Sequence, residues 1–202
     1  MKIRQCYLIL VCGLCLFLGS ASATAIEDPV SFLEKLSLQV MGNLKDNKEE
    51  IQKNGSKIYE IVNKDIVPYV DFEEMSRWVA GRAAWAKSSK AEQASFVHEF
   101  KRLVVKTYAT ALVGFADEQV VFPAQNADTS RKRLEIVSYV KRRGDTISIK
   151  YRLLKTANSW KVYDAEVEGV SILRGFMAQF SSDVRLNGLT AVTRRIKLHN
   201  EK

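Results

Sequence analysis

The chain contains little cysteine, proline or glycine. Its 202 residues include 3 cysteines, 3 prolines and 10 glycines, which leaves little room for long linkers or low-complexity tracts. All three cysteines, Cys6, Cys12 and Cys15, lie in the first 25 residues. The rest of the chain therefore has no disulfide, no thiol nucleophile and no thiolate metal site. Its core must be held together by hydrophobic packing.

The first 25 residues have the pattern of an export signal. Lys2 and Arg4 give a basic start, and an uncharged, largely apolar run of 13 residues follows, ending at Leu18. Small residues come next and fit a signal-peptidase cleavage site. A run of 13 is shorter than the roughly 20 residues that a transmembrane helix needs. We therefore predict a cleaved signal peptide over residues 1–25 and a single domain over residues 26–202.

Basic residues outnumber acidic ones. The formal net charge is +8, and it falls to +6 when Lys2 and Arg4 leave with the signal. The basic residues form short clusters, such as those at 131–133 and 141–143, without interleaved aromatic residues. Binding of nucleic acid usually needs both kinds of side chain, so we expect no nucleic-acid partner. The clusters are typical of solvated faces or of docking surfaces for acidic proteins or lipid head groups.

Motifs for catalysis and metal binding are missing from the sequence. Residues 26–202 contain two histidines, His98 and His199, and neither has a second metal ligand at a typical spacing. The sequence has no G-x-S-x-G, P-loop or G-x-G-x-x-G motif. We predict that the protein is not an enzyme and has no catalytic residue, no metal and no cofactor.

Three carboxylates alternate along one predicted strand, at Asp164, Glu166 and Glu168. Paired carboxylates can act in acid–base catalysis or bind calcium. The interpretation that we favour is a solvated strand face, paired with Lys150 and Arg152 on the neighbouring strand.

The hydrophobic pattern changes its period along the chain. Residues 28–113 have helical periodicity, divided by capping, proline and glycine signals. From residue 118 the period becomes two, and the short connections predict an antiparallel meander. A helical pattern returns at Ser171. This order predicts an α+β fold, in which helices pack on one face of a twisted antiparallel sheet and leave a cone-shaped space between the layers.

The longest predicted helix, residues 90–113, has an unusually wide apolar surface. Its apolar side chains span about 200° of the circumference, roughly twice the usual stripe. Lys101 is the one charged residue within this arc. Such a helix is either packed inside the core or lines an apolar space.

Two stretches, Val70–Leu112 and Trp160–Phe180, carry a specific combination of motifs. In order, these are D-F-x-x-M-x-R, F-x-x-x-F, W-x-V-x-D and V-E-G-V-S. With them, the sequence resembles the MlaC or toluene-tolerance family, the periplasmic phospholipid-binding components of the Mla lipid-transport system. The resemblance extends over nearly all of the chain after residue 25. Many members of the family have Tyr-Arg where this chain has Phe176-Met177.

The resemblance implies a nuclear-transport-factor-two-like fold that encloses a deep apolar pocket. It implies a periplasmic carrier that takes glycerophospholipid as its cargo and performs no chemistry. It further implies shuttling between the inner-membrane Mla ABC transporter complex and an outer-membrane lipoprotein–porin complex, which maintains the lipid asymmetry of the outer membrane. We expect the carrier to be a monomer.

We predict that ten residues bind the lipid. They come from the apolar arc of the long helix, from one cleanly alternating strand and from two positions nearby: Phe100, Val104, Tyr108, Leu112, Ile147, Ile149, Tyr151, Leu153, Val167 and Phe176.

Two other functions remain open on the sequence. An enzyme built on the same cone-shaped fold would use Asp164 or His98 as its base, with a shifted pKa inside the pocket. A periplasmic adaptor or chaperone would have a filled core and would act through its basic surface, with salt-sensitive binding.

Overall fold

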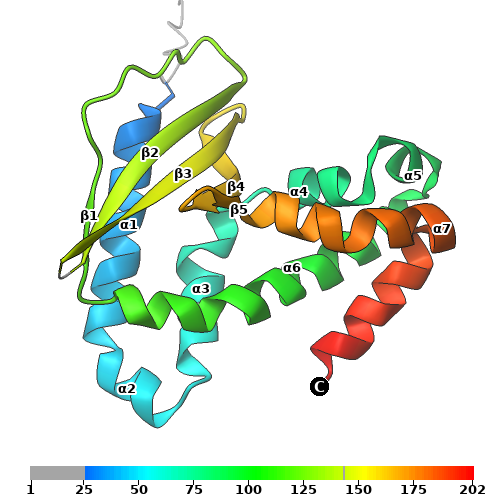
Figure 1. The fold of residues 1–202 in the computed structure, drawn as a ribbon, viewed down its shortest axis with the longest axis horizontal. Helices are drawn as coiled ribbons and strands as arrows, with labels where there is room; N and C mark the ends of the chain where they lie inside the picture. Colours follow the sequence, from blue (N-terminus) through cyan, green and yellow to red (C-terminus); the bar gives the residue numbers. More distant parts are fainter. Residues whose placement is uncertain (1–25, 143) are drawn as a thin grey trace, which may run out of the picture.

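The computed structural model describes residues 26–142 and 144–202, so the predicted signal peptide over residues 1–25 lies outside the described residues. Helices come first, a sheet follows, and a long helix ends the chain (Figure 1). The helices are α1 Pro29–Asp46, α2 Lys48–Lys53, α3 Lys57–Asp65, α4 Phe72–Ala80, α5 Arg82–Lys87, α6 Lys90–Leu112 and α7 Ile172–Asn200, with short 3-10 turns η1 Val67–Tyr69 and η2 Val113–Phe115.

The helices α1, α4, α6 and α7 begin at the capping residues that the sequence predicts. Before α1, the Asp28 carboxylate accepts a hydrogen bond from the Ser31 amide at 2.9 Å. At the start of α6, Ser89 and Glu92 form a reciprocal capping box. Two further caps are Asp71 at α4 and Ser171 at α7. Each cap satisfies backbone donors that the first turn of a helix leaves without partners.

The first helix is longer than its sequence suggests. Gly42 and Asn43 predict its end, but α1 continues to Asp46. Leu44, in the last turn of α1, is fully buried against α3 and α6. Burial of a leucine contributes about 2 kcal/mol, which exceeds the cost of about 1 kcal/mol for glycine inside a helix. Packing therefore carries the helix past its local stop signal.

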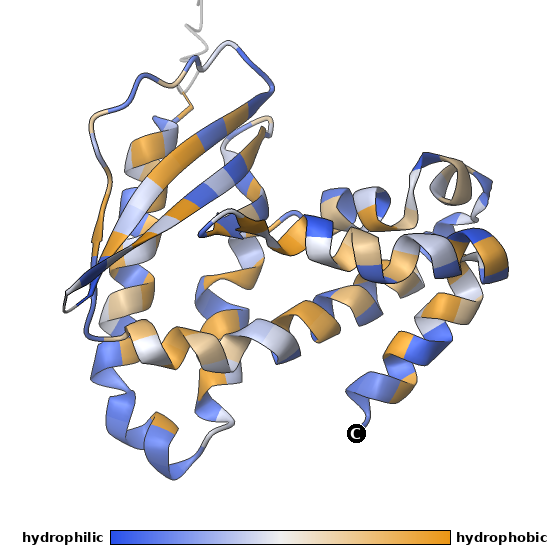
Figure 2. Ribbon diagram, in the orientation of Figure 1, coloured by the Kyte–Doolittle hydropathy of each residue, from blue (hydrophilic) through white to orange (hydrophobic). Residues whose placement is uncertain are grey.

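The strands form one antiparallel meander in the order β1-β2-β3-β4-β5. Apolar and polar positions alternate along β2 and β3 (Figure 2). Arg143, in the predicted turn between these two strands, lies outside the described residues. The strands are β1 Gln119–Val121, β2 Arg133–Arg142, β3 Asp145–Lys155, β4 Trp160–Val167 and β5 Val170–Ser171.

Among the described residues, buried apolar side chains form three separate clusters. The helical cluster joins α4, α6 and α7 around Phe96, Phe100 and Val192. The N-terminal cluster joins α1, α3 and α6 around Leu44 and Ile58. The sheet cluster joins α1 to one face of β2, β3 and β4, through Phe32, Leu33, Leu134, Ile136 and Leu153. We call that face of the sheet the inner face. Figure 1 shows α1 behind β2 and β3, with the other face of these strands turned toward the viewer.

A bulge in β4 moves Tyr163 away from the predicted face. Arg152 pairs with Asp164 and Leu153 pairs with Val162, so Tyr163 is the extra residue. Simple alternation predicts Tyr163 on the face opposite Asp164, and this prediction is wrong. Tyr163 packs into the helical cluster, whereas Val162 packs into the sheet cluster.

The last helix has a sharp kink. Gly188 in α7 has a φ of 80° and a ψ of 164°, which divides the helix into two arms. Figure 1 shows the second arm folded back toward α6, and Asn200 at its end donates a hydrogen bond to the Glu99 carbonyl at 3.0 Å. Among the helices of the described residues, none has both the length and the apolar composition to cross a bilayer.

Candidate functional site

The inner face of the sheet is fully covered at one end and only partly covered at the other, which we call the open end. There, Ser138 and Val140 of β2 are buried, whereas their partners on β3 are covered only in part. Leu153 is fully buried under α1 in the sheet cluster. Ile147 and Ile149 lie on the same face of β3 by alternation, and both are half-buried. Ile149 pairs across the strands with Val167, which is also half-buried. None of these last three residues belongs to the clusters formed by the described residues.

A second partly exposed apolar stretch lies along α6. Phe100 is fully buried in the helical cluster, and Leu112 packs against the N-terminal cluster. Between them, Val104 is half-buried and Tyr108 is 38% exposed. The helix thus passes from one cluster to another through apolar side chains that the protein covers only in part.

Aromatic rings join α6 to the first arm of α7. The ring of Phe176 lies 5.1 Å from Phe100 and 6.1 Å from Tyr108, edge to face in both cases, and 6.2 Å from Phe180 in a stacked arrangement. Phe176 therefore contacts two of the other predicted residues, Phe100 and Tyr108. Burial raises the pKa of the Tyr108 phenol, and this hydroxyl stays neutral at physiological pH.

Tyr151 closes part of the inner face. Its ring stacks on Phe122 at 6.2 Å, and its hydroxyl lies 3.4 Å from the Ser138 hydroxyl. Burial raises the pKa of Tyr151 more than hydrogen bonds with Ser138 and Ser37 lower it. Tyr151 packs against the sheet cluster. Along β3 it lies between Leu153, at the packed end of the inner face, and Ile149, at the open end.

The structure thus separates the ten predicted residues into two groups. Phe100, Leu153 and Phe176 are buried in core clusters, and Tyr151 packs on one of them. The remaining six are half-buried or exposed: Val104, Tyr108, Leu112, Ile147, Ile149 and Val167. Sequence reasoning missed Ala165, a half-buried partner of Tyr151 on the inner face, and Phe180, which extends the aromatic group. The alternation of β4 and the helical period of α7 contain the signal for both.

The carboxylates of β4 pair with basic residues, as predicted, but their face is not solvated. Asp164 is 2% exposed and Glu166 is also buried. Arg152 pairs with Asp164, and its Nη2 lies 3.1 Å from a Glu166 carboxylate oxygen. Burial acts to raise the pKa of Glu166, but hydrogen bonds from Arg152 and Lys150 outweigh it and the pKa is lowered. The prediction of a solvated face is wrong for Asp164 and Glu166, because the start of α7 covers them, whereas Glu168 is exposed as predicted.

Of the two side chains that an enzyme would use as its base, Asp164 is held by hydrogen bonds and His98 is exposed. Asp164 accepts hydrogen bonds from the Ser171 hydroxyl at 2.7 Å and from the Leu173 amide at 2.9 Å. The His98 side chain is 63% exposed, with its Nε2 3.9 Å from Glu99. Among residues 26–142 and 144–202, no three acidic, histidine or cysteine side chains are grouped to hold a metal ion.

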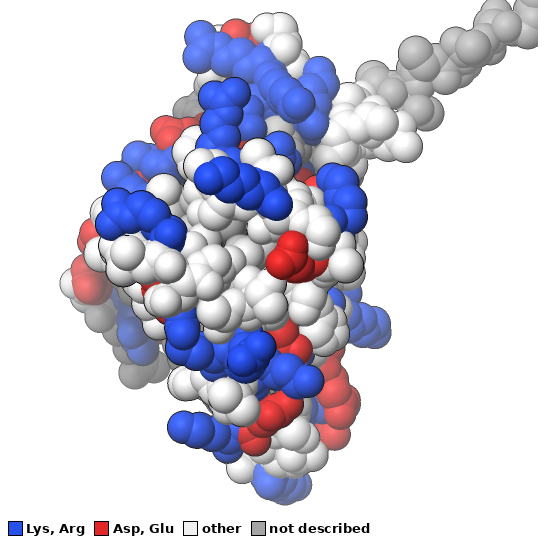
Figure 3. All heavy atoms as spheres, turned by 90° about the vertical axis from the view of Figure 1, so that its right-hand side faces the viewer, with Lys and Arg blue, Asp and Glu red and all other residues white. Residues whose placement is uncertain are grey.

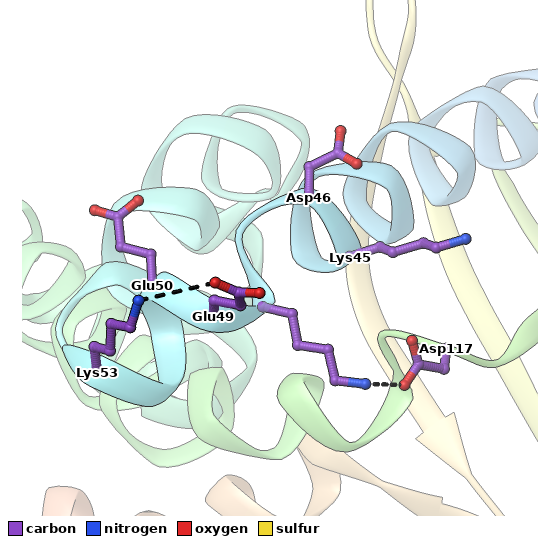
Figure 4. Close-up of a pocket in the computed structure, with 7 residues that line it drawn as sticks. Lys45, Asp46, Glu49, Glu50, Lys53 and Asp117 are labelled. Atoms are coloured by element: carbon purple, nitrogen blue, oxygen red, sulfur yellow. Dashed lines mark hydrogen bonds and ion pairs between the residues drawn. The ribbon is translucent and has the colours of Figure 1, made fainter.

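Two hollows on the surface are lined mainly by polar residues. One, of about 580 Å³, is bordered by lysines and carboxylates of α1 and α2 and by Asp117 (Figure 4). The other, of about 290 Å³, lies between α3, α6 and the end of α7. Neither hollow includes any of the ten predicted residues. The prediction of an apolar pocket therefore depends on the partly covered inner face and the apolar stretch of α6.

The fold is that of a solved phospholipid-binding protein. The structure matches a protein from Ralstonia solanacearum, solved in complex with a phospholipid, with a TM-score of 0.77 and 24% identity. The match covers 87% of this chain and 98% of that one. The α+β fold class that the sequence predicts is thereby confirmed.

The chain belongs to the MlaC family. The family model for MlaC protein matches residues 34–197. Toluene tolerance protein ttg2D of Pseudomonas putida is 24% identical over 164 residues, which are 81% of this chain and 76% of that protein. The intermembrane phospholipid transport system binding protein MlaC of Haemophilus influenzae is 24% identical over 199 residues, 96% of this chain and 92% of that protein. The resemblance drawn from the motifs is confirmed.

Proposed function

We propose that the protein is a periplasmic carrier of glycerophospholipid. It takes a lipid from one membrane and releases it to the other, without chemistry, and so maintains the lipid asymmetry of the outer membrane. Three findings support this: membership of the MlaC family, a relative named as a phospholipid transport binding protein, and a similar structure that was solved with a phospholipid.

The observation that carries the proposal is the open end of the inner face. A domain of this size commonly buries its apolar side chains in one contiguous core. Here Ile147, Ile149 and Val167 remain half-buried outside all three clusters of the described residues. The acyl chains would cover these residues and the partly exposed Val104 and Tyr108 of α6. The ring of Phe176 would limit the space at the α7 end.

The free energy of lipid transfer favours a site that covers the acyl chains, and the transfer needs no catalysis. Each buried methylene is worth about 0.8 kcal/mol, so two chains of about 16 carbons represent on the order of 25 kcal/mol against water. The lipid loses a similar amount when it leaves a bilayer. The net free energy of transfer is then small, and loading and unloading are both possible. The head group stays near the opening, where selectivity is loose.

The carrier is exported to the periplasm and acts there as a single domain. Residues 1–25 are removed during export, and residues 26–202 act as one monomeric domain. Its partners are the inner-membrane Mla ABC transporter complex and an outer-membrane lipoprotein–porin complex. Asp164, the base that an enzyme on this fold would use, is held by Arg152, Ser171 and the Leu173 amide, and this arrangement does not favour the enzyme alternative.

Gentle purification tests the proposal. The full chain is expressed with its signal, isolated without detergent, and analysed by native mass spectrometry and by extraction of bound lipid. We expect the folded protein to carry bound phospholipid, at about one lipid molecule per chain. Protein that is isolated repeatedly without any bound lipid, and that takes up none from vesicles, would contradict the proposal.

A further inference from the structure

The hollow between α3, α6 and the end of α7 carries net positive charge. Its lining residues are Tyr59, Asn63, Lys101, Arg102, Val105, Lys106 and Asn200, so it has three cations and no carboxylate. The hollow of Figure 4 is the natural comparison, because its three lysines are matched by four carboxylates and two ion pairs cross it. A hollow with cations alone favours an anionic ligand.

The three cations of this hollow have few acidic partners. Nη1 of Arg102 lies 3.0 Å from Oε2 of Glu99, so Arg102 is partly neutralised. Nζ of Lys106 donates to the backbone carbonyl of Asn200 at 3.3 Å, which is an uncharged acceptor. Lys101 makes no ion pair with any described residue. At least two ammonium groups can therefore bind an anion without giving up a salt bridge.

A buried polar atom at the wall of the hollow also lacks a partner. Asn200 is 9% exposed, and its Nδ2 donates to the carbonyl and to Oε2 of Glu99, at 3.0 and 2.9 Å. Its Oδ1 is buried and accepts no hydrogen bond from the described residues. Buried acceptors in native proteins are nearly always satisfied. Since Oδ1 is buried, it does not face a ligand, and the lining cations alone favour a ligand with anionic oxygens.

We propose that this hollow binds the phosphate of a glycerophosphate group, in which the anionic oxygens lie between Lys101 and Lys106. Lys101 is three residues before Val104 and seven before Tyr108, so all three lie on one stripe of α6. The hollow is thus next to the apolar stretch but shares no residue with it. The site goes beyond the proposed function, since it needs no acyl chain.

Calorimetric titration of the exported, processed chain tests the site. The probes are sn-glycerol 3-phosphate, glycerophosphoethanolamine and inorganic phosphate, at constant ionic strength because salt screens exposed charge. We expect saturable binding to the wild type. The double variant K101Q/K106Q should weaken it about tenfold or more, since each of the two substitutions removes a charge-assisted hydrogen bond to the anion. The matched variant K45Q/K48Q, which removes the same charge from the neutralised hollow, should bind as the wild type does.

The outcomes are distinct. Tighter binding of either glycerophosphate probe than of inorganic phosphate assigns the site to a lipid head group, and the reverse order assigns it to free phosphate. Equal weakening by the two double variants, or no saturable binding, overturns the proposal. Lipid extraction from the same samples reports separately on the carrier function, so a failure of this site cannot be confused with a failure of acyl-chain binding.

Discussion

The Ser171 hydroxyl, at the cap of α7, donates a hydrogen bond at 2.7 Å to the buried carboxylate of Asp164 on β4. The same carboxylate accepts from the Leu173 amide and pairs with Arg152 of β3. One carboxylate thus connects the first turn of α7 to two strands. Since α7 also carries Phe176, this connection fixes the aromatic group relative to the inner face.

Replacing Asp164 by asparagine should destabilise the protein. D164N keeps the size of the side chain but leaves Arg152 without its most buried partner, and loss of one member of a buried pair costs about 3 kcal/mol. Urea denaturation measures the change in the free energy of unfolding. E135Q is the matched control, because Glu135 pairs with the same Arg152 at an exposed site. It should cost less than about 1 kcal/mol, and equal losses would contradict the assigned role.

Acid should weaken the fold through Glu74. Burial acts to raise the pKa of this carboxyl, but hydrogen bonds from Arg133 and Trp78 outweigh it and hold the pKa below its ordinary value of 4.5. A lowered carboxyl pKa contributes stability that is complete above pH 4.5 and is lost as the pH falls through the folded-state pKa. Unfolding measured from pH 7 to pH 3 should therefore depend less on pH in E74Q, which is also less stable at pH 7. An unchanged pH dependence would exclude Glu74 as the cause.

The kink of α7 can be tested at two glycines of the same helix. Neither Gly188 nor Gly175 has a neighbouring atom within 4 Å of an added Cβ, and only Gly188 has a positive φ, of 80°. G188A should lose about 1–3 kcal/mol of unfolding free energy, because essentially only glycine adopts this combination of φ and ψ without strain. G175A should be neutral or gain up to about 1 kcal/mol, because alanine favours the helix. Equal effects would mean that backbone strain does not hold the kink.

The aromatic group should depend on Phe176. This ring contacts three others, whereas Phe122 contacts Tyr151 alone among the aromatic pairs of the described residues. Each such pair contributes about 0.5–1.5 kcal/mol beyond burial. F176L should therefore reduce the free energy of unfolding by about 2 kcal/mol, and F122L by less than half as much. Chemical denaturation of both variants decides the order, and a larger loss in F122L would contradict it.

Local signals explain what the sequence predicted of the fold. Caps such as Asp28 and Ser89 and the period of two in β3 act within a few residues, so they could be recognised without knowledge of the tertiary structure. The bulge at Tyr163 and the continuation of α1 past Gly42 arise from packing between distant segments. No short stretch of sequence contains that information. The burial of Asp164 has the same origin, because α7 covers it from outside the sheet.

In the candidate site, too, local pattern predicted some features and tertiary packing decided the others. Alternation predicted that Ile149 and Leu153 share a face of β3, and the register agrees. It could not predict that α1 covers Leu153 and leaves Ile149 half-buried, since this depends on where the helix ends over the sheet. The family resemblance supplied the function, and the burial pattern separates the residues that support the core from those that remain to be covered.

The central claim is that acyl chains cover the open end of the inner face. Native mass spectrometry of I149E and T146E, purified in parallel with the wild type, tests it most directly, because both place a carboxylate on β3 and only the first lies on that face. Circular dichroism confirms that each variant is folded. We predict that the wild type and T146E carry phospholipid and that I149E carries at least tenfold less, since a buried charge opposes acyl chains. Wild-type lipid occupancy in folded I149E would contradict the account.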